Sequence, residues 1–181
     1  MSYTQNDGDL HKHIQGFCEL HRRRWNLTST PSIFNDPNYC GFLEYAMKSL
    51  AAKGQADVFY LMIEDRPVAF LIVFIYDHTY CQFMTANDTS LSQFAPGIVL
   101  LTESLEDNLH KDYKEYDFMR GAEKYKLRYA NRIKKLYKLS LHKNILLFAL
   151  DNLSSRLELY IKQHENLYNF FIKFEKKLRI F

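Results

Sequence analysis

The run of residues 68–76, VAFLIVFIY, constrains the fold of this chain more than any other segment. Because the run is nearly all apolar, a strand built from it must be covered on both faces. It is also far shorter than the roughly 20 apolar residues that a membrane helix needs. Turn residues on either side, Asp65-Arg66-Pro67 and Asp77-His78, predict neighbouring strands over residues 57–64 and 79–86. The sequence therefore predicts a sheet buried between helices.

Two helices are predicted before this sheet and one after it. Residues 9–25 and 98–109 keep the 3.6-residue apolar period, and the later helix places Ile98, Leu101, Leu105 and Leu109 on one face. Asp36 followed by Pro37 is a typical helix start, and Gly54 a typical helix end. Residues 87–96 read as a polar loop, and alternating side chains predict further strands over residues 116–119 and 132–143.

The last part of the chain, residues 144–181, differs in kind because it contains neither Gly nor Pro. Mostly apolar residues recur there with heptad spacing, at Leu150, Leu153, Leu157, Tyr160, Leu167, Phe171, Phe174 and Leu178, with His164 as the one polar position of the series. A lone domain does not offer enough surface to cover so long a stripe, which predicts a helix for oligomerisation or partner docking. The alternative is two shorter helices that fold back, separated at Asp151-Asn152 or at residues 164–166.

Composition argues against several classes of protein. The net charge is only +3, too small by itself to indicate a nucleic-acid binder, although the basic, Tyr-rich residues 124–143 permit RNA binding. Three widely spaced cysteines with no CxxC pair predict reduced thiols, and the histidines show no metal-ligand spacing. The first residues lack the apolar core of a signal peptide. We therefore expect a cytoplasmic protein with no disulfide and no metal.

The stretch from Phe94 to Tyr129 carries a family resemblance. Pro96-Gly97, followed by the series Asp117-Phe118-x-Arg120-Gly121-x-Glu123-x-Tyr125-Lys126, resembles the GNAT-type acyltransferases of the cellulose-biosynthesis (CelD/BcsL-like) branch. That branch is related in fold to the peptidoglycan aminoacyl transferases. The upstream segment LHRRRW is similar to the family's helix that ends in a basic cluster and Trp. The likeness covers about residues 16–141, and the chain departs from the family pattern at Ala95, Ala122, Lys124 and Tyr129.

The resemblance implies both fold and activity. The fold would be α/β (α+β), with a GNAT-like mixed, mostly antiparallel twisted sheet of about six strands, helices on both faces, and a long C-terminal helix. Residues 1–143 would form the acyltransferase domain and residues 144–181 a helical extension for dimerisation or docking. The reaction would be direct transfer of an acyl group from acetyl-CoA or another acyl-CoA to an amine or hydroxyl of a small or saccharide-linked acceptor, in bacterial polysaccharide biosynthesis.

The resemblance also implies site residues. A loop that opens a helix frees backbone N–H groups that suit phosphates, so acyl-CoA would bind at Gln93, Phe94, Ala95, Pro96, Gly97 and Ile98. Lys126 sits where the related aminoacyl transferases place a lysine near the reacting carbonyl, a position suited to stabilising an oxyanion. Tyr125 would orient the substrate or return a proton, and Asp117 or Glu123 would act as base. Arg120 and Tyr129 would bind substrate.

Each of these assignments has a structural alternative. The Pro-Gly loop would then be an ordinary strand-to-helix turn, the basic segment a solvated turn, and Asp117 a hydrogen-bond acceptor for the Gly121 loop. Family members often carry two tandem GNAT-like halves, and this chain has room for one. The alternative function is therefore a non-catalytic GNAT-like interaction module, or half of a two-domain transferase, that assembles as a homodimer through its C-terminal helix.

Overall fold

The structure is a computed structural model that describes residues 2–4, 7–28, 30–111, 113–121, 123–137 and 139–164. It divides into two compact units, the first ending at Ala130 and the second beginning at Asn131. Of the described helices, none is long and apolar enough to cross a membrane.

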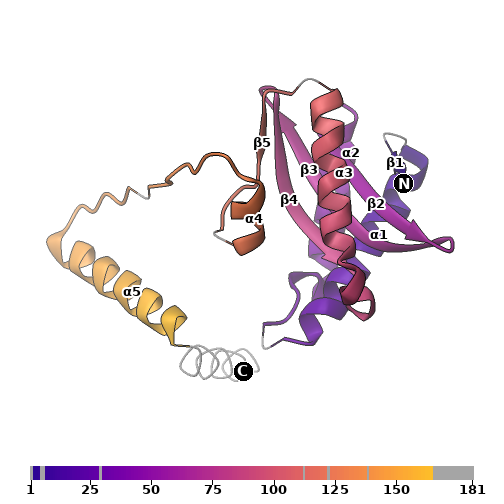
Figure 1. The fold of residues 1–181 in the computed structure, drawn as a ribbon. Helices are drawn as coiled ribbons and strands as arrows, with labels where there is room; N and C mark the ends of the chain where they lie inside the picture. Colours follow the sequence, from indigo (N-terminus) through magenta and orange to yellow (C-terminus); the bar gives the residue numbers. More distant parts are fainter. Residues whose placement is uncertain are drawn as a thin grey trace. The chain divides into compact units, whose positions relative to one another are not determined.

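The first unit is built on a mixed sheet with helices on both faces (Figure 1). Within the described residues the sheet has five strands in the order β1-β2-β3-β4-β5. They are β1 (Ser2–Thr4), β2 (Ala56–Ile63), β3 (Arg66–Tyr76), β4 (Thr79–Asn87) and β5 (Glu115–Asp117). All neighbours are antiparallel except β4 and β5, which are parallel. The predicted fold class is confirmed, with residues 68–73 of β3 buried throughout.

Tight two-residue turns set the register of the central strands. Glu64 and Asp65 join β2 to β3 with φ of 49° and 60°, and Asp77 and His78 join β3 to β4 with φ of 44° and 57°. Such turns match the twist of the strands that they connect. The predicted turn at Asp65-Arg66-Pro67 is thus wrong in position, because β3 begins at Arg66 and Pro67 pairs with Met62.

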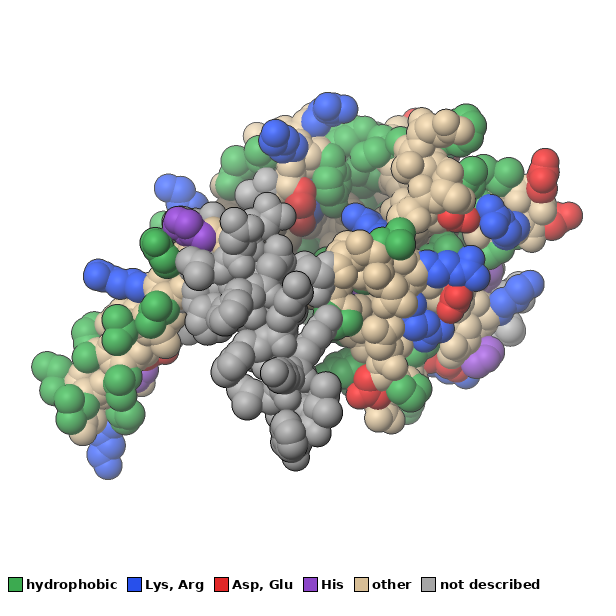
Figure 2. All heavy atoms as spheres, turned by 90° about the horizontal axis from the view of Figure 1, so that it is seen from below, with side chains coloured by type: hydrophobic (Ala, Val, Ile, Leu, Met, Phe, Trp, Pro, Cys, Tyr) green, Lys and Arg blue, Asp and Glu red, His purple; other side chains and the backbone are tan. Residues whose placement is uncertain are grey.

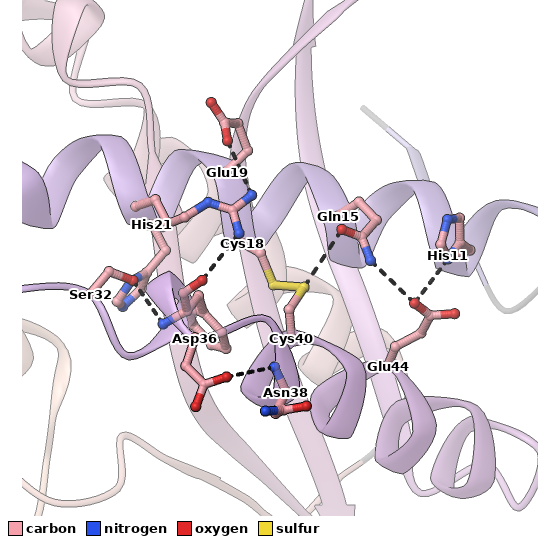
Figure 3. Close-up of a disulfide and its surroundings, with 12 residues drawn as sticks. His11, Gln15, Cys18, Glu19, His21, Ser32, Asp36, Asn38, Cys40 and Glu44 are labelled. Carbon is pink, nitrogen blue, oxygen red and sulfur yellow. Dashed lines mark hydrogen bonds and ion pairs between the residues drawn. A yellow bond between two sulfur atoms is a disulfide. The ribbon is translucent and has the colours of Figure 1, made fainter.

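Helices α1 (Asp7–Asn26) and α2 (Pro37–Ala51) cover one face of the sheet. Asp36 caps α2 by accepting a hydrogen bond from the Asn38 N–H at 2.9 Å, as predicted. A disulfide joins Cys18 of α1 to Cys40 of α2 (Figure 3). The prediction of three reduced thiols is therefore wrong for this pair, because the two helices bring their cysteines to the same point of the core.

Helix α3 (Pro96–His110) covers the other face, in front of the sheet in Figure 1. Its buried residues are Pro96, Leu100, Leu101, Ser104 and Asn108. The predicted apolar face was therefore partly wrong, since Ile98 and Leu109 are exposed. Ser104 is buried on this face although it is polar, because its hydroxyl forms hydrogen bonds with both the Leu101 carbonyl and the Tyr116 hydroxyl. Two short 3-10 helices are also present, η1 (Ile33–Asn35) and η2 (Thr89–Phe94), and the second lies within the segment predicted as a polar loop.

The predicted strand over residues 132–143 is not formed in the residues of that segment that the structure describes, 132–137 and 139–143. The described part of this segment is irregular, and its apolar side chains Ile133, Leu136, Leu139 and Leu141 are exposed. Alternation alone does not make a strand, since the backbone N–H and C=O groups also need a neighbouring strand to pair with. Helix α4 (Lys124–Tyr129), in the first unit, forms at the start of the basic, Tyr-rich segment.

The second unit contains helix α5 (Ile145–Gln163). Hydrophobic side chains are exposed along it, visible at the left of Figure 2. The first part of the predicted heptad stripe lies on this helix, and Leu150, Leu153 and Leu157 are 62%, 57% and 50% exposed. The later stripe positions, from Leu167 to Leu178, lie outside the described residues.

Candidate active site

Strands β4 and β5 run together for only a short distance. They pair in parallel from Thr79–Glu115 to Cys81–Asp117. The chain then turns away at Met119, which has a φ of 59°, while β4 continues to Asn87. The Asp117 carboxylate accepts a hydrogen bond from the Met119 N–H at 2.7 Å and so fixes this turn. Beyond Cys81, β4 still pairs with β3 but has no described strand on its other side, which opens the sheet at this edge.

A β-bulge re-aims β4 at the same point. Ile72 pairs with Met84 and Val73 with Gln82, so Phe83 is an extra residue on β4. Bulges bend a strand and are frequent next to active sites. The Gln82 side chain, which is buried, contacts two tyrosine hydroxyls: its Nε2 donates to Tyr125 at 3.4 Å, and its Oε1 accepts from Tyr116 at 3.5 Å.

A pocket of about 480 Å³ lies at this opening. It is lined by five segments of the first unit: the end of α1, the far half of β4, the η2 turn, the start of α3 and the segment from β5 to α4. The lining residues are His21, Arg24, Trp25, Gln82, Phe83, Met84, Thr85, Asn87, Ser92, Ala95, Pro96, Gly97, Ile98, Leu101, Phe118, Met119, Arg120, Glu123, Tyr125 and Lys126.

The start of α3 forms one wall of the pocket. Ala95 precedes the helix with a left-handed φ of 46°, and no side chain caps the first turn. A Cβ on Gly97 would have only the Asn87 side chain near it, at 3.6 Å, so the backbone is open to a close approach. Pro96 has no N–H, and the N–H groups of Ile98 and Val99 donate to the Ala95 carbonyl at 2.8 and 3.2 Å, so the Gly97 N–H and the helix dipole are what favour an anion here. Of the predicted cofactor residues, Ala95, Pro96, Gly97 and Ile98 line the pocket, whereas Gln93 and Phe94 do not.

Lys126 holds the loop that precedes α4. Its Nζ, in a mostly buried side chain, donates to the Arg120 carbonyl at 2.8 Å and pairs with a Glu123 carboxylate oxygen at 2.9 Å. The Lys126 hydrogen bond lowers the pKa of Glu123 below its usual value, so the carboxylate stays charged. Gly121 has a φ of 115°, which residues with a Cβ rarely adopt, and a Cβ there would also push the Glu123 carboxylate from its present position.

Of the other predicted site residues, two line the pocket and two do not. Tyr125 and Arg120 line the pocket, and burial raises the pKa of the Tyr125 hydroxyl, which keeps it protonated. Asp117 and Tyr129 do not line it. Asp117 lies just outside, where its carboxylate fixes the Met119 turn.

The pocket also contains residues that the sequence did not single out. His21 accepts or donates a hydrogen bond with the Ser32 hydroxyl at 2.8 Å (Figure 3), and it stacks on Trp25. Burial, with a smaller effect of the Arg24 charge, lowers the pKa of His21 to about 4, so its ring is neutral. The family-like segment LHRRRW contains His21, Arg24 and Trp25, and this was the one available signal. Gln82, Thr85 and Asn87 had none, because a strand sequence does not reveal a bulge.

Comparisons with known proteins agree with this fold. An aminoglycoside acetyltransferase, meta-AAC0020, from an uncultured soil metagenomic sample was solved with sisomicin, and it is 15% identical with a TM-score of 0.52 over 79% of this chain and 93% of its own. The same protein solved with trehalose is 17% identical, with a TM-score of 0.52 over 78% and 95%.

A GNAT family acetyltransferase of Staphylococcus aureus is 15% identical, with a TM-score of 0.50 over 77% of this chain and all of its own. No curated protein sequence matches this chain. At these identities the structures show a shared fold. The sequence model of the acetyltransferase (GNAT) domain matches residues 4–127, more than half of the chain, and this protein therefore belongs to the GNAT acetyltransferase domain family.

Proposed function

We propose that this protein is an acyl-CoA-dependent N- or O-acyltransferase. It would transfer the acyl group of acetyl-CoA, or of another acyl-CoA, directly to its acceptor. One observation carries the proposal: a single pocket joins the uncapped start of α3 to Lys126, Tyr125 and Glu123. The first feature suits the phosphates of a nucleotide-linked substrate, and the second provides groups for proton transfer and charge stabilisation.

The backbone at Ala95, Pro96, Gly97 and Ile98 would hold the phosphates of acyl-CoA. These residues precede or open a helix of ordinary length whose first N–H groups have no side-chain cap. Gln93 and Phe94, in the preceding η2 turn, would contact other parts of the same molecule. When bound, acyl-CoA supplies an activated thioester carbonyl.

The side chains around Lys126 suit acyl transfer. Two N–H groups of its Nζ are used by Arg120 and Glu123, which leaves one to donate to the carbonyl oxygen of the bound thioester. Tyr125, kept protonated by burial, would give its hydroxyl proton to the leaving sulfur. The Glu123 carboxylate would accept the proton of the attacking amine or hydroxyl, although its lowered pKa makes it a weak base. Asp117 would hold the Met119 turn and so support this wall of the pocket.

The acceptor in this proposal is a small or saccharide-linked amine or hydroxyl, bound in the pocket beside Arg120, and Tyr129 would contact only a part of it that extends outside the pocket. A sugar-containing acceptor agrees with the aminoglycoside acetyltransferase of similar fold, which was solved with sisomicin and with trehalose. The motif order from Pro96 to Lys126 supports the cellulose-biosynthesis branch of the family and a role in bacterial polysaccharide biosynthesis. Acyl-CoA is made in the cytoplasm, which we propose as the location.

A second candidate is a non-catalytic module that assembles through residues 144–181, and the exposed apolar side chains of α5 favour it. The two proposals are compatible if the extension serves a homodimeric enzyme. They differ in one property that is simple to measure, since a non-catalytic module has no need to bind CoA.

Binding of CoA decides between them. A ligand at 100 times its dissociation constant stabilises a protein by about 2.7 kcal/mol, so acetyl-CoA should raise the melting temperature of the full chain. Gly97→Val should weaken this effect, because the added side chain crowds the start of α3 where the ligand would bind. The variant should still fold, since its Cβ would meet only the Asn87 side chain, at an ordinary contact distance of 3.6 Å. Gly41→Val is the matched control, because a Cβ on Gly41 of α2 meets nothing within 4 Å. If millimolar acetyl-CoA and CoA both leave the wild-type melting temperature unchanged, the non-catalytic proposal replaces the enzyme.

A further inference from the structure

The pocket carries positive charge that no carboxylate of the described residues balances by an ion pair. Its charged residues are Arg24, Arg120, Glu123 and Lys126. Glu123 and Lys126 pair with each other at 2.9 Å. Among the described residues, no carboxylate lies within ion-pair distance of Arg24 or Arg120. His21 adds no charge near neutral pH, because its pKa is lowered to about 4. Two guanidinium groups thus remain for a ligand.

Arg24 differs from the two arginines that precede it. Glu19 binds Arg22 at 3.1 Å and Arg23 at 2.8 Å on the surface of α1. Arg24 instead donates to the side-chain oxygen of Asn87, a pocket residue on β4, at 3.3 Å. The run of three arginines is therefore divided by Glu19, which holds two of them outside the pocket and leaves the third lining it.

Two neighbours show where the Arg24 charge acts. After burial, the Arg24 charge is the next cause that lowers the pKa of His21. Burial raises the pKa of Tyr125, and the Arg24 charge opposes that shift. The Arg24 charge therefore acts on groups of both α1 and α4 that line the same pocket.

We propose that Arg24 makes the pocket selective for an acyl acceptor that carries a carboxylate or phosphate in addition to its reacting amine or hydroxyl. This inference rests on the proposed acyl-transfer function and names its class of substrate. Arginine presents paired N–H donors that match both anions. An aminoglycoside, with its several amines, would meet like charges here and find only a carboxylate that Lys126 already holds. The acceptor class would therefore differ from that of the aminoglycoside acetyltransferase of similar fold.

Pairs of acceptors that differ only in an acidic group test this proposal on the full chain. Suitable pairs are glutamate with glutamine and glucosamine 6-phosphate with glucosamine, with sisomicin as the polycation. CoA release from acetyl-CoA gives the rates, and calorimetry in the presence of CoA gives binding. We expect the acidic member of a pair to exceed its neutral partner by about tenfold or more in kcat/KM or in affinity, a typical value for one charge-assisted contact.

Arg24→Gln should remove that preference through KM or affinity, with kcat and the KM for acetyl-CoA little changed. Arg23→Gln is the matched control, because Arg23 is exposed and paired with Glu19. Equal rates and equal binding for both members of every pair would overturn the proposal, as would preferential use of sisomicin. An Arg24→Gln effect confined to acetyl-CoA would assign Arg24 to the CoA phosphates and also overturn it. If the wild type fails to bind acetyl-CoA, the proposed acyltransferase function is refuted instead. Calorimetry with the acceptor pairs alone then still reports whether Arg24 selects acidic ligands.

Discussion

At the residue scale, Lys126 is a charged side chain in a mostly buried position, which is an unusual combination. It is buried, and a buried ammonium is costly unless it is paired and hydrogen-bonded. The Arg120 carbonyl and the Glu123 carboxylate meet that need at 2.8 and 2.9 Å. The same contacts fix the position of the remaining N–H, which is the property that a donor to a developing oxyanion requires.

We therefore predict that Lys126→Ala lowers turnover by about a hundredfold, the usual cost of losing one such donor. Because the variant also leaves the 120–123 loop without its clamp, its free energy of unfolding should fall by about 1.5 to 3 kcal/mol. Steady-state kinetics and urea unfolding of the same samples measure both effects. Lys124→Ala, at an exposed neighbouring position, is the control. A folded Lys126→Ala protein with full activity would show that the lysine is only structural.

His21 makes stability depend on pH. Its ring lies among Phe17, Trp25 and Phe34, bonds Ser32, and feels the charge of Arg24, so burial and that charge lower its pKa to about 4. In the unfolded chain the value returns to about 6.5. The unfolded state therefore binds the proton first, and the contribution of the neutral ring is complete above pH 6.5 and is lost as pH falls toward 4.

Between pH 7.5 and 4.5 this loss should amount to about 2 to 3 kcal/mol. The free energy of unfolding of wild type and of His21→Asn, measured at both pH values, isolates it from the carboxylates. The difference between the two proteins should shrink at low pH. His78→Asn, at an exposed turn where Asn tolerates the positive φ of 57°, should show no such change. A His21→Asn protein that keeps the full pH dependence of wild type would contradict the assignment.

At the scale of elements, sequence reasoning succeeded where local chemistry decides the structure. The apolar run of β3, the Asp36 cap of α2 and the turn at Asp77-His78 each depend on a few adjacent residues. It failed where the outcome depends on distant partners. Residues 132–143 alternate as a strand does, yet the described part has no strand to pair with. Cys18 and Cys40 look unrelated in sequence until α1 and α2 pack.

The candidate site follows the same rule. The start of α3 and the α4 segment were found because their motifs are continuous in sequence, and the structure brings both to one pocket. The three adjacent arginines of α1 read from the sequence as a solvated helix face, with contact to an anionic substrate as the less favoured alternative, because nothing local tells which of them turns inward. In the structure Glu19 and Asn87 make that choice. The Cys18–Cys40 disulfide lies one helical turn before His21 and joins residues that are 22 positions apart in the sequence. A bridge of this loop length constrains the unfolded chain and should raise the free energy of unfolding by about 3 kcal/mol.

At the scale of the whole molecule, the two units differ in how they satisfy their apolar residues. The first buries clusters on both faces of its sheet. Helix α5 of the second leaves Leu150, Leu153, Leu157 and Tyr160 at least half exposed along one stripe. Each fully buried leucine contributes about 1.5 to 3 kcal/mol, so a partner that covered this stripe would gain appreciable stability.

We therefore predict that the full chain self-associates through α5, most simply as a symmetric dimer in which the same stripe contributes from both copies. Leu153→Glu combined with Leu157→Glu places two charges in the centre of the stripe. This double variant should be a monomer at micromolar concentration, because the free energy cost of burying two carboxylates in an apolar interface exceeds the free energy gained from that interface. Asn152→Glu, off the stripe, adds a charge to the same helix and should leave the dimer intact. Light scattering coupled to gel filtration measures all three masses. A monodisperse wild-type monomer would exclude the dimer, and α5 would then have to cover its stripe within its own chain.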